Sequence, residues 1–163
     1  MARNNLNTEL EKVLIFDVWG PLAHFRKYYT NSSSLSYLFP PRTIVTGLIA
    51  GLLGLPSEIY AKGEEEPYYE MFDGGKSLVA VSVRTKVKRL MQTINYLATD
   101  DFPKTVDKLL NKMMGGEIGH TQIPLEILLP ENGNNIIYRV YFYHENEKIY
   151  VELKRRLKEQ RFV

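Results

Sequence analysis

The sequence predicts an α+β protein with a split β-α-β arrangement, the ferredoxin-like or RRM-like fold class. A β-rich run and an apolar helix come first in the 163-residue chain, an alternating strand follows, and a second strand and an amphipathic helix come last. This order is the ferredoxin-like order without its last strand, so either the chain is truncated there or another element closes the sheet. Residues 1–163 are expected to form a single domain with an insertion at about residues 89–123.

The first strand is predicted over residues 12–19, KVLIFDVW. Apolar side chains occupy both of its faces, which is typical of a strand inside a sheet. An apolar helix is predicted between Pro41 and Pro56, because proline favours the first helical position and cannot continue a helix. The side chains that share one apolar face of this helix are Ile44, Leu48, Leu52 and Leu55. Glycines near a second face predict close packing against the sheet: Gly47, Gly51 and Gly54.

The clearest alternation in the chain covers residues 77–88, SLVAVSVRTKVK. Its valines share one face, so we predict a half-buried strand with a basic outer face. Further on, a capped helix is predicted over residues 99–116 and a loop with extended pieces over residues 117–130. A strand over residues 136–143 and an amphipathic helix over residues 146–160 follow.

Composition excludes several classes of protein. The chain has no cysteine, which excludes disulfides and thiolate chemistry, and its net charge of +2 is too small to indicate a nucleic-acid partner by itself. The N-terminus lacks the apolar core of a signal peptide, and the longest apolar run, residues 44–55, is too short to span a bilayer. We therefore expect a cytoplasmic protein that makes no contact with a membrane.

Spacing also excludes two common chemistries. Residues 73–77, DGGKS, resemble the end of a P-loop, but Glu70 stands where that motif needs glycine, and a strand follows where a helix is required. The histidines His24, His120 and His144 form no metal-ligand pattern with carboxylates. We expect no metal and no cofactor.

A basic, aromatic loop leads from the first strand to the start of the apolar helix. Its cations are Arg26, Lys27 and Arg42, and its aromatic side chains, which offer stacking surfaces for unpaired bases, are Phe25, Tyr28, Tyr29 and Tyr37. The split β-α-β order can place the strand that carries Arg84, Lys86 and Lys88 beside this loop. The pattern indicates RNA binding. The alternative is that the aromatic rings close the sheet edge and the cations form a solvated face.

The same loop admits a second hypothesis. Metal-free RNA cleavage needs a general base, a general acid and a cation near the phosphate, and His24, Lys27, Tyr28 and Tyr29 supply these groups. Spacing alone does not show that the side chains converge, so chance proximity stays the alternative.

Residues 19–54 resemble the family numbered five among the CRISPR-associated proteins, which are RAMP-superfamily subunits of type I Cascade complexes. The matching residues are Gly20, Pro21, Ala23, Phe25, Arg26, Tyr37, Pro40, Pro41, Arg42, Thr43, Gly47, Leu48, Gly51 and Gly54. Residues 124–128 and 138–141 also resemble the family, best in the branch found with subtype I-B-like systems.

The resemblance implies a ferredoxin-like domain with an inserted β-hairpin thumb, which would fall within residues 89–123. It also implies a last strand and a small C-terminal region, which we expect to be missing here. It implies a noncatalytic subunit that grips the 5′ handle of the CRISPR RNA and caps the backbone of the complex. The implied partners are CRISPR RNA, the Cascade backbone and large subunits, and target DNA within the complex. In subtype I-C the family member is itself the nuclease, using Tyr, Lys and His. A metal-independent endoribonuclease that processes precursor CRISPR RNA is therefore the alternative.

Each candidate residue has an expected role under this resemblance. The RNA-binding residues would be Phe25, Arg26, Lys27, Tyr37, Arg42, Thr43, Arg84, Lys86 and Lys88. The arginines and lysines would bind handle phosphates, with help from helix amides near Thr43, while Phe25 and Tyr37 would stack on or shape the handle bases. If the chain is an enzyme, the catalytic residues would be His24, Lys27 and Tyr28.

Overall fold

The fold is α+β, as predicted. The structure, a computed structural model, describes residues 12–28, 33–63, 65–97, 110–111, 114–115 and 120–160. Most of the helix predicted over residues 99–116 lies outside the described residues. The elements are β1 (Leu14–Gly20), α2 (Arg42–Leu53), α3 (Tyr68–Met71), β2 (Ser77–Val83), β3 (Val87–Leu97), β4 (His120–Pro130), β5 (Ile136–His144) and α5 (Glu147–Glu159).

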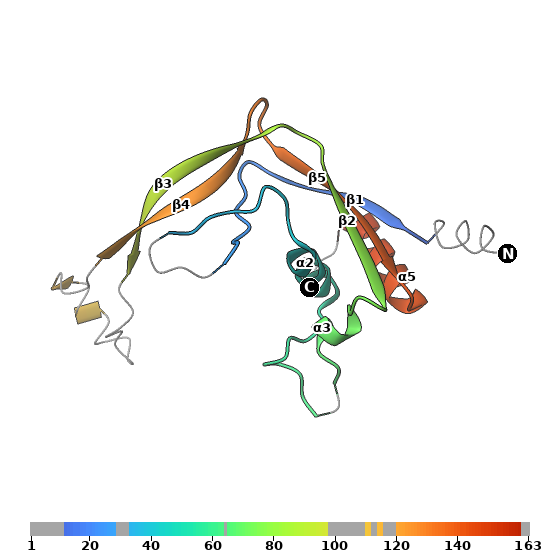
Figure 1. Ribbon diagram of the computed structural model, residues 1–163. Coiled ribbons are helices and arrows are strands. Elements are labelled where there is room, and N and C mark those ends of the chain that lie inside the picture. Colours follow the sequence, from blue (N-terminus) through green and yellow to red (C-terminus); the bar gives the residue numbers. More distant parts are fainter. Residues whose placement is uncertain are drawn as a thin grey trace.

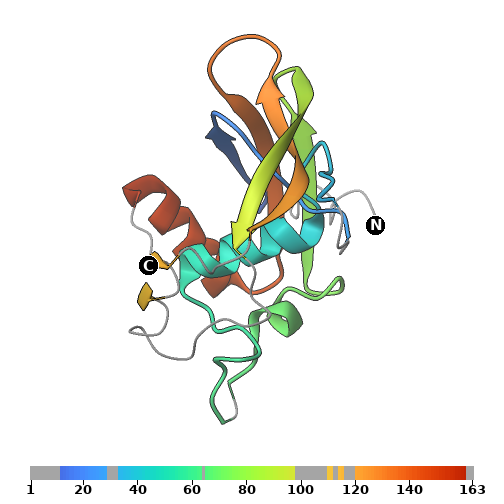
Figure 2. The same cartoon turned by 90° about the vertical axis from the view of Figure 1, so that its left-hand side faces the viewer.

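The main sheet has the strand order β1-β5-β2, and β5 is antiparallel to both neighbours. β1 and β2 are therefore parallel and connected through α2, which is the predicted split β-α-β unit. Residues along β5 alternate between buried and half-buried, as the two faces of a central strand require. Helices α2 and α5 both lie beneath one face of the sheet (Figures 1 and 2).

The main core lies between that face and the two helices. Its buried members are Val45, Ile49, Ala50, Phe72, Val140, Phe142, Ile149 and Leu153. The face of α2 that Ile44 and Leu48 share is not its buried face, because these two side chains are 37% and 40% exposed, while Leu52 is partly buried against the core. Thr46 takes a place on the buried face, since its hydroxyl donates to the Arg42 carbonyl oxygen (3.1 Å) and needs no water.

The glycines of α2 pack less closely than predicted. A Cβ atom added at Gly47 would lie 3.7 Å from the Tyr68 hydroxyl oxygen, which is ordinary contact, and one at Gly51 would meet nothing within 4 Å. Gly54 instead ends the helix. It adopts the left-handed conformation at φ 69°, and its amide donates to carbonyl oxygens of the last turn.

Strand β1 is an edge strand among the described strands, not the interior strand that its two apolar faces predicted. Its outward side chains include Ile15 and Trp19, which are 57% and 68% exposed. The prediction failed because the face of the sheet opposite the helices is itself lined with apolar and aromatic side chains, so apolar character did not indicate burial.

The strand predicted over residues 77–88 is two strands in different sheets. β2 ends at Val83 because the Thr85 hydroxyl, and not a further backbone carbonyl, accepts the hydrogen bond from the Ile137 amide (3.0 Å). β3 then begins at Val87 and pairs with β4 from Val87↔Pro130 to Leu97↔His120.

The extended pieces predicted within the loop over residues 117–130 are one continuous strand from His120 onward, where β4 begins. Its prolines are tolerated because a strand of a two-stranded sheet has an edge at which no amide donor is required. The β3–β4 hairpin is inserted between β2 and β5, and its far end lies well away from helices α2 and α5 (Figure 1).

Helix α5 follows its predicted boundaries closely. The Asn146 side chain caps it by accepting a hydrogen bond from the Lys148 amide (3.0 Å), and Ile149 and Leu153 are buried. Arg155 and Arg156 both donate to the Glu152 carboxylate, at 2.6–3.0 Å. Arg156 also donates to the Leu52 carbonyl oxygen (2.8 Å), which ties α5 to α2.

Acid is expected to weaken this connection. Hydrogen bonds from Arg155 and then Arg156 lower the pKa of Glu152 from 4.5 to about 2. Because the folded-state pKa lies below the unfolded value, the stabilisation is present above pH 4.5 and is lost as the pH falls toward 2. Urea denaturation between these pH values should show a steeper loss of stability in the wild type than in Glu152→Gln. Glu131→Gln, an exposed carboxylate in the β4–β5 turn, should follow the wild type.

Candidate nucleic-acid interface

The loop after β1 is hydrogen-bonded along strand β4. The amides of Ala23 and Leu128 each donate to the other's carbonyl oxygen, at 3.0 and 2.8 Å. Further along the loop, the Ser34 amide donates to Pro124 (2.8 Å), and the Glu126 amide donates to Ser34 (2.9 Å). Two separate parts of the loop thus extend the hairpin sheet at the edge of β4, so the loop has a defined position relative to the hairpin.

The two parts of the loop also pair with each other. The Lys27 amide donates to the Leu35 carbonyl oxygen (3.0 Å), and the Tyr37 amide donates to that of Phe25 (2.7 Å). The Ser36 hydroxyl accepts a hydrogen bond from the Phe25 amide (2.8 Å). The backbone on both sides of Arg26 is therefore fixed, which limits the conformational entropy that a ligand would have to remove.

Glu126 holds this arrangement together, and sequence reasoning missed it. Its side chain is 10% exposed, one carboxylate oxygen accepts from the Ser36 amide (2.8 Å), and the other lies 3.5 Å from the Arg89 Nε atom. The only signal in the sequence was a lone carboxylate in the apolar run PLEILL. A charge that is buried in such a run needs partners, and here they come from the loop and from β3.

His24 has a positioning role in the structure. Its Nδ1 atom lies 2.7 Å from the Glu126 carbonyl oxygen, which can only accept, so Nδ1 carries the proton. The Nε2 atom lies 3.1 Å from the Ser34 hydroxyl and accepts from it. Both ring nitrogens are thus used to hold the loop on the hairpin.

Phe25 lies in a small second core and not on the surface. Its ring meets the ring of Tyr138 edge to face, with centroids 5.4 Å apart, beside the buried side chains of Leu128 and Ile136. The Tyr138 hydroxyl donates to the Leu38 carbonyl oxygen (2.9 Å), and burial raises the pKa of Tyr138 to about 12. This packing matches the alternative in which an aromatic ring of the loop closes the sheet edge.

Arg42 is directed into the protein. Its Nη2 atom donates to the Phe72 carbonyl oxygen (2.5 Å) and to the Ser77 hydroxyl (2.9 Å), so it connects the start of α2 to α3 and β2. Thr43 is exposed beside it, and its carbonyl oxygen accepts from the Thr46 hydroxyl (3.1 Å). The phosphate role expected for Arg42 does not fit these contacts.

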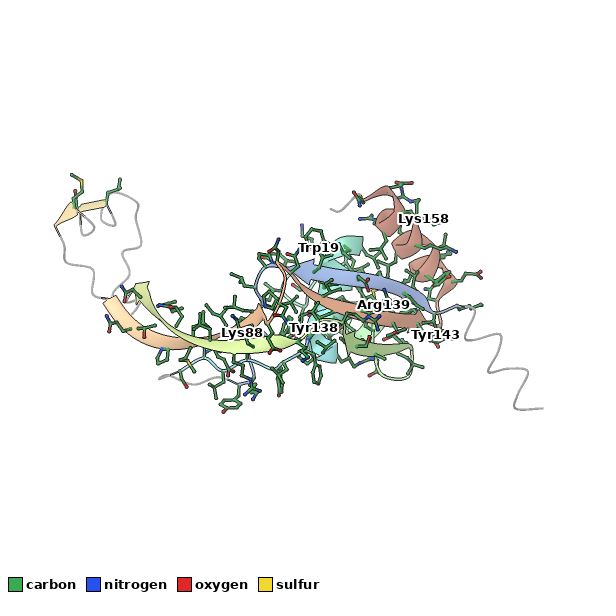
Figure 3. The ribbon with its side chains drawn as sticks, turned by 90° about the horizontal axis from the view of Figure 1, so that it is seen from above. Trp19, Lys88, Tyr138, Arg139, Tyr143 and Lys158 are labelled. Atoms are coloured by element: carbon green, nitrogen blue, oxygen red, sulfur yellow. The ribbon has the colours of Figure 1, made fainter. Side chains whose placement is uncertain are left out.

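The remaining predicted residues present cations and two aromatic rings to solvent. The Lys27 ammonium lies over the ring of Tyr37, 5.7 Å from its centroid, and that ring is 38% exposed. Lys86 and Lys88 are exposed where the hairpin begins, and Figure 3 shows Lys88 on that part of the hairpin. The other exposed predicted residues are Arg26, Tyr28 and Arg84. Tyr29 lies outside the described residues.

The structure therefore brings together the loop and the base of the hairpin. Lys27 and Tyr37 come from the loop, which is bonded to β4, while Lys86 and Lys88 come from the start of β3, the partner strand of β4. Arg89 is excluded from this group, because its charge is matched by that of Glu126.

Among the described residues, no group of three or more His, Cys, Asp or Glu side chains could hold a metal ion. None of the described helices is long and apolar enough to cross a membrane.

Comparison with known proteins was made at the levels of sequence and fold. The family model described as "CRISPR-associated protein (Cas_Cas5)" matches residues 13–117, more than half of the chain. A solved structure titled "CRISPR RNA-guided surveillance complex" contains a chain with the same fold, with a TM-score of 0.52 and 11% identity. The match covers 86% of this chain and 52% of that one, so the present chain spans about half the length of its structural relative. No curated protein matches the sequence.

Proposed function

The chain belongs to the Cas5 family of CRISPR-associated proteins, and from that membership we propose that it is a noncatalytic CRISPR RNA-binding subunit of a type I Cascade complex. Its ligand is the 5′ handle of the CRISPR RNA, and it caps the backbone of the complex, in contact with the backbone and large subunits and near the target DNA. The subtype is I-B-like. The fold shared with a chain of an RNA-guided surveillance complex supports this assignment.

The observation that carries the proposal is the docking of the basic loop on the inserted hairpin. Hydrogen bonds from His24, Ser36 and Ala23 to β4 hold the loop before any ligand arrives. The loop and the base of the hairpin then present Lys27, Lys86 and Lys88, which bind phosphates as point charges. The exposed ring of Tyr37 adds a surface on which a base can stack.

The same geometry supports a noncatalytic role. A general base needs a nitrogen or oxygen that can reach the 2′-hydroxyl of the RNA. Both nitrogens of His24 are engaged in holding the loop, so the imidazole cannot accept that proton without giving up a structural hydrogen bond.

Replacing Lys27, Lys86 and Lys88 together with alanine is expected to weaken binding of handle RNA by about tenfold or more. The salt dependence should also fall by about 2 in the slope of log K against log[salt], because each lysine that neutralises a phosphate contributes about 0.7 for single strands. Fluorescence anisotropy over a salt series measures both quantities. A matched control replaces three exposed lysines of α5 and the α2–α3 connection, Lys62, Lys148 and Lys158, and should keep the wild-type slope.

Equal losses in the two triple variants would show that net charge alone attracts the RNA and would contradict the proposed site. The same experiment tests the enzymatic alternative. Repeat RNA incubated with the protein in EDTA should keep its length, whereas a shortened product that is lost in Tyr28→Phe or His24→Ala would identify an endoribonuclease.

A further inference from the structure

The face of the main sheet opposite the helices carries an exposed tryptophan. Helices α2 and α5 cover only the other face (Figure 2), and Trp19, Arg139 and Tyr143 lie on the open face when the molecule is seen from above (Figure 3). Trp19 is 68% exposed. A large aromatic side chain that is mostly exposed to water contributes little hydrophobic stabilisation, which points to a role other than folding.

The pairing of the strands places cations beside this indole. Trp19 lies opposite Ile137, whose carbonyl oxygen accepts a hydrogen bond from the Arg84 amide (2.9 Å), so these residues form one row across the sheet. Two residues back along β1, and so on the same face, Asp17 lies opposite Arg139. Trp19 and both arginines therefore occupy one end of the open face.

The charge of this end is positive. Arg139 donates two hydrogen bonds to the Asp17 carboxylate, at 2.8 and 2.9 Å, which neutralises one cation with one anion. These hydrogen bonds are the main cause of the lowered pKa of Asp17, and the field of Arg84 adds to it. Among the outward-facing positions of the described strands β1, β5 and β2, Asp17 is the only acidic residue. These strands therefore supply no second carboxylate to balance the positive charge of Arg84.

We propose that Trp19 is a stacking site for an unpaired base of single-stranded RNA, with Arg84 binding an adjacent phosphate. This inference rests on the proposed function and adds a second RNA contact, distinct from the docked loop. Single-stranded RNA is the ligand class that supplies both an exposed π-face for the indole and a negative charge for the guanidinium. A pocket of about 240 Å³ lies at the same end of β1, around the strand edge, where Trp19 and Leu22 meet Phe25 and Tyr138 of the second core.

The chain provides its own reporter, because Trp19 is its only tryptophan. Titration of the full chain with single-stranded handle RNA should quench the indole fluorescence, since a base stacked on the ring removes it from water. An RNA of the same length in which abasic sites replace the bases should bind through its phosphates and leave the fluorescence nearly unchanged. Anisotropy of a labelled RNA measures binding in parallel.

Mutagenesis separates stacking from charge. Trp19→Ala should weaken RNA binding by about 5- to 150-fold, as found for one stacked base, with an unchanged salt slope. Trp19→Phe should restore most of the affinity. Leu78→Ala is the matched control, because Leu78 is 62% exposed on the same face but at the opposite end, opposite Tyr143, and its loss should leave affinity unchanged.

The outcomes distinguish the two proposals. RNA binding without quenching, or equal quenching by the abasic RNA, would overturn the stacking site and leave the proposed function standing. An absence of RNA binding by anisotropy would overturn both. Quenching by a protein subunit of the complex in the absence of RNA, without quenching by RNA, would overturn stacking and identify the open face as a protein interface.

Discussion

Glu126→Ala is expected to lower the free energy of unfolding by about 3 kcal/mol, the cost of leaving buried partners of a carboxylate unsatisfied. The substitution removes the acceptor for the Ser36 amide and the counter-ion of Arg89. Ser36 is fully buried, so water cannot replace the lost hydrogen bond without opening the loop. RNA affinity should fall with stability, because the loop that carries Lys27 loses its side-chain attachment to β4 at Ser36.

Urea denaturation and hydrogen exchange at residues 33–37 measure the two effects. Exchange should quicken at these residues more than in α2, whose amides do not depend on Glu126. The control is Glu131→Ala, an exposed carboxylate in the turn after β4. If Glu126→Ala and Glu131→Ala unfold at the same urea concentration, Glu126 does not hold the loop.

Phe142→Ala should be more costly still, at about 4 kcal/mol, because it leaves a cavity in the centre of the main core. The Phe142 ring is completely buried and meets the ring of Phe72 with centroids 5.8 Å apart. Since β5 is the strand on which both β1 and β2 pair, the remaining structure has little freedom to close the cavity.

A urea midpoint measured by circular dichroism tests this expectation. Ile15→Ala, which shortens a 57% exposed side chain on the open face of the neighbouring strand, should change stability by about 0.5 kcal/mol or less. Similar losses in the two variants would contradict the assignment of the core to the helix-covered face.

Much of the fold could be predicted because local patterns and tertiary burial agree for those elements. Strand β5 alternates strictly and is half-buried on one face, and α5 has a capping asparagine followed by apolar residues at helical spacing. Strand β1 could be located but not placed in the sheet. Its position at the edge depends on a topology that periodicity does not contain.

The break between β2 and β3 could not be predicted from alternation. The alternation extends through residues 77–88, and the one polar residue among the alternate valines is Thr85. Its hydroxyl bonds to Ile137 and interrupts the pairing, whereas threonine is otherwise a common strand residue. The contact joins residues 52 positions apart, and nothing local to either residue reveals it.

The candidate site shows the same division. The sequence located the loop and its cations, and Lys27, Lys86 and Lys88 are solvent-accessible in part or in full. It did not distinguish them from Arg42, whose hydrogen bonds to Phe72 and Ser77 require the folded arrangement of three elements. Whether a cation of the loop is exposed or engaged in hydrogen bonds depends on the groups that surround it in the folded chain. The residue types alone do not reveal those neighbours.

The central position of β5 has a consequence for when the protein becomes functional during synthesis. Both β1 and β2 pair with β5 alone in the main sheet, so neither has its partner until residues 136–144 have been translated. His24 likewise waits for Glu126, 102 residues later, which a ribosome adds in roughly 5–20 s. A nascent chain that already displays the basic loop therefore holds it in no fixed shape during that interval. Under the proposed function, the ordered loop therefore becomes available to RNA only after the hairpin and β5 have been made.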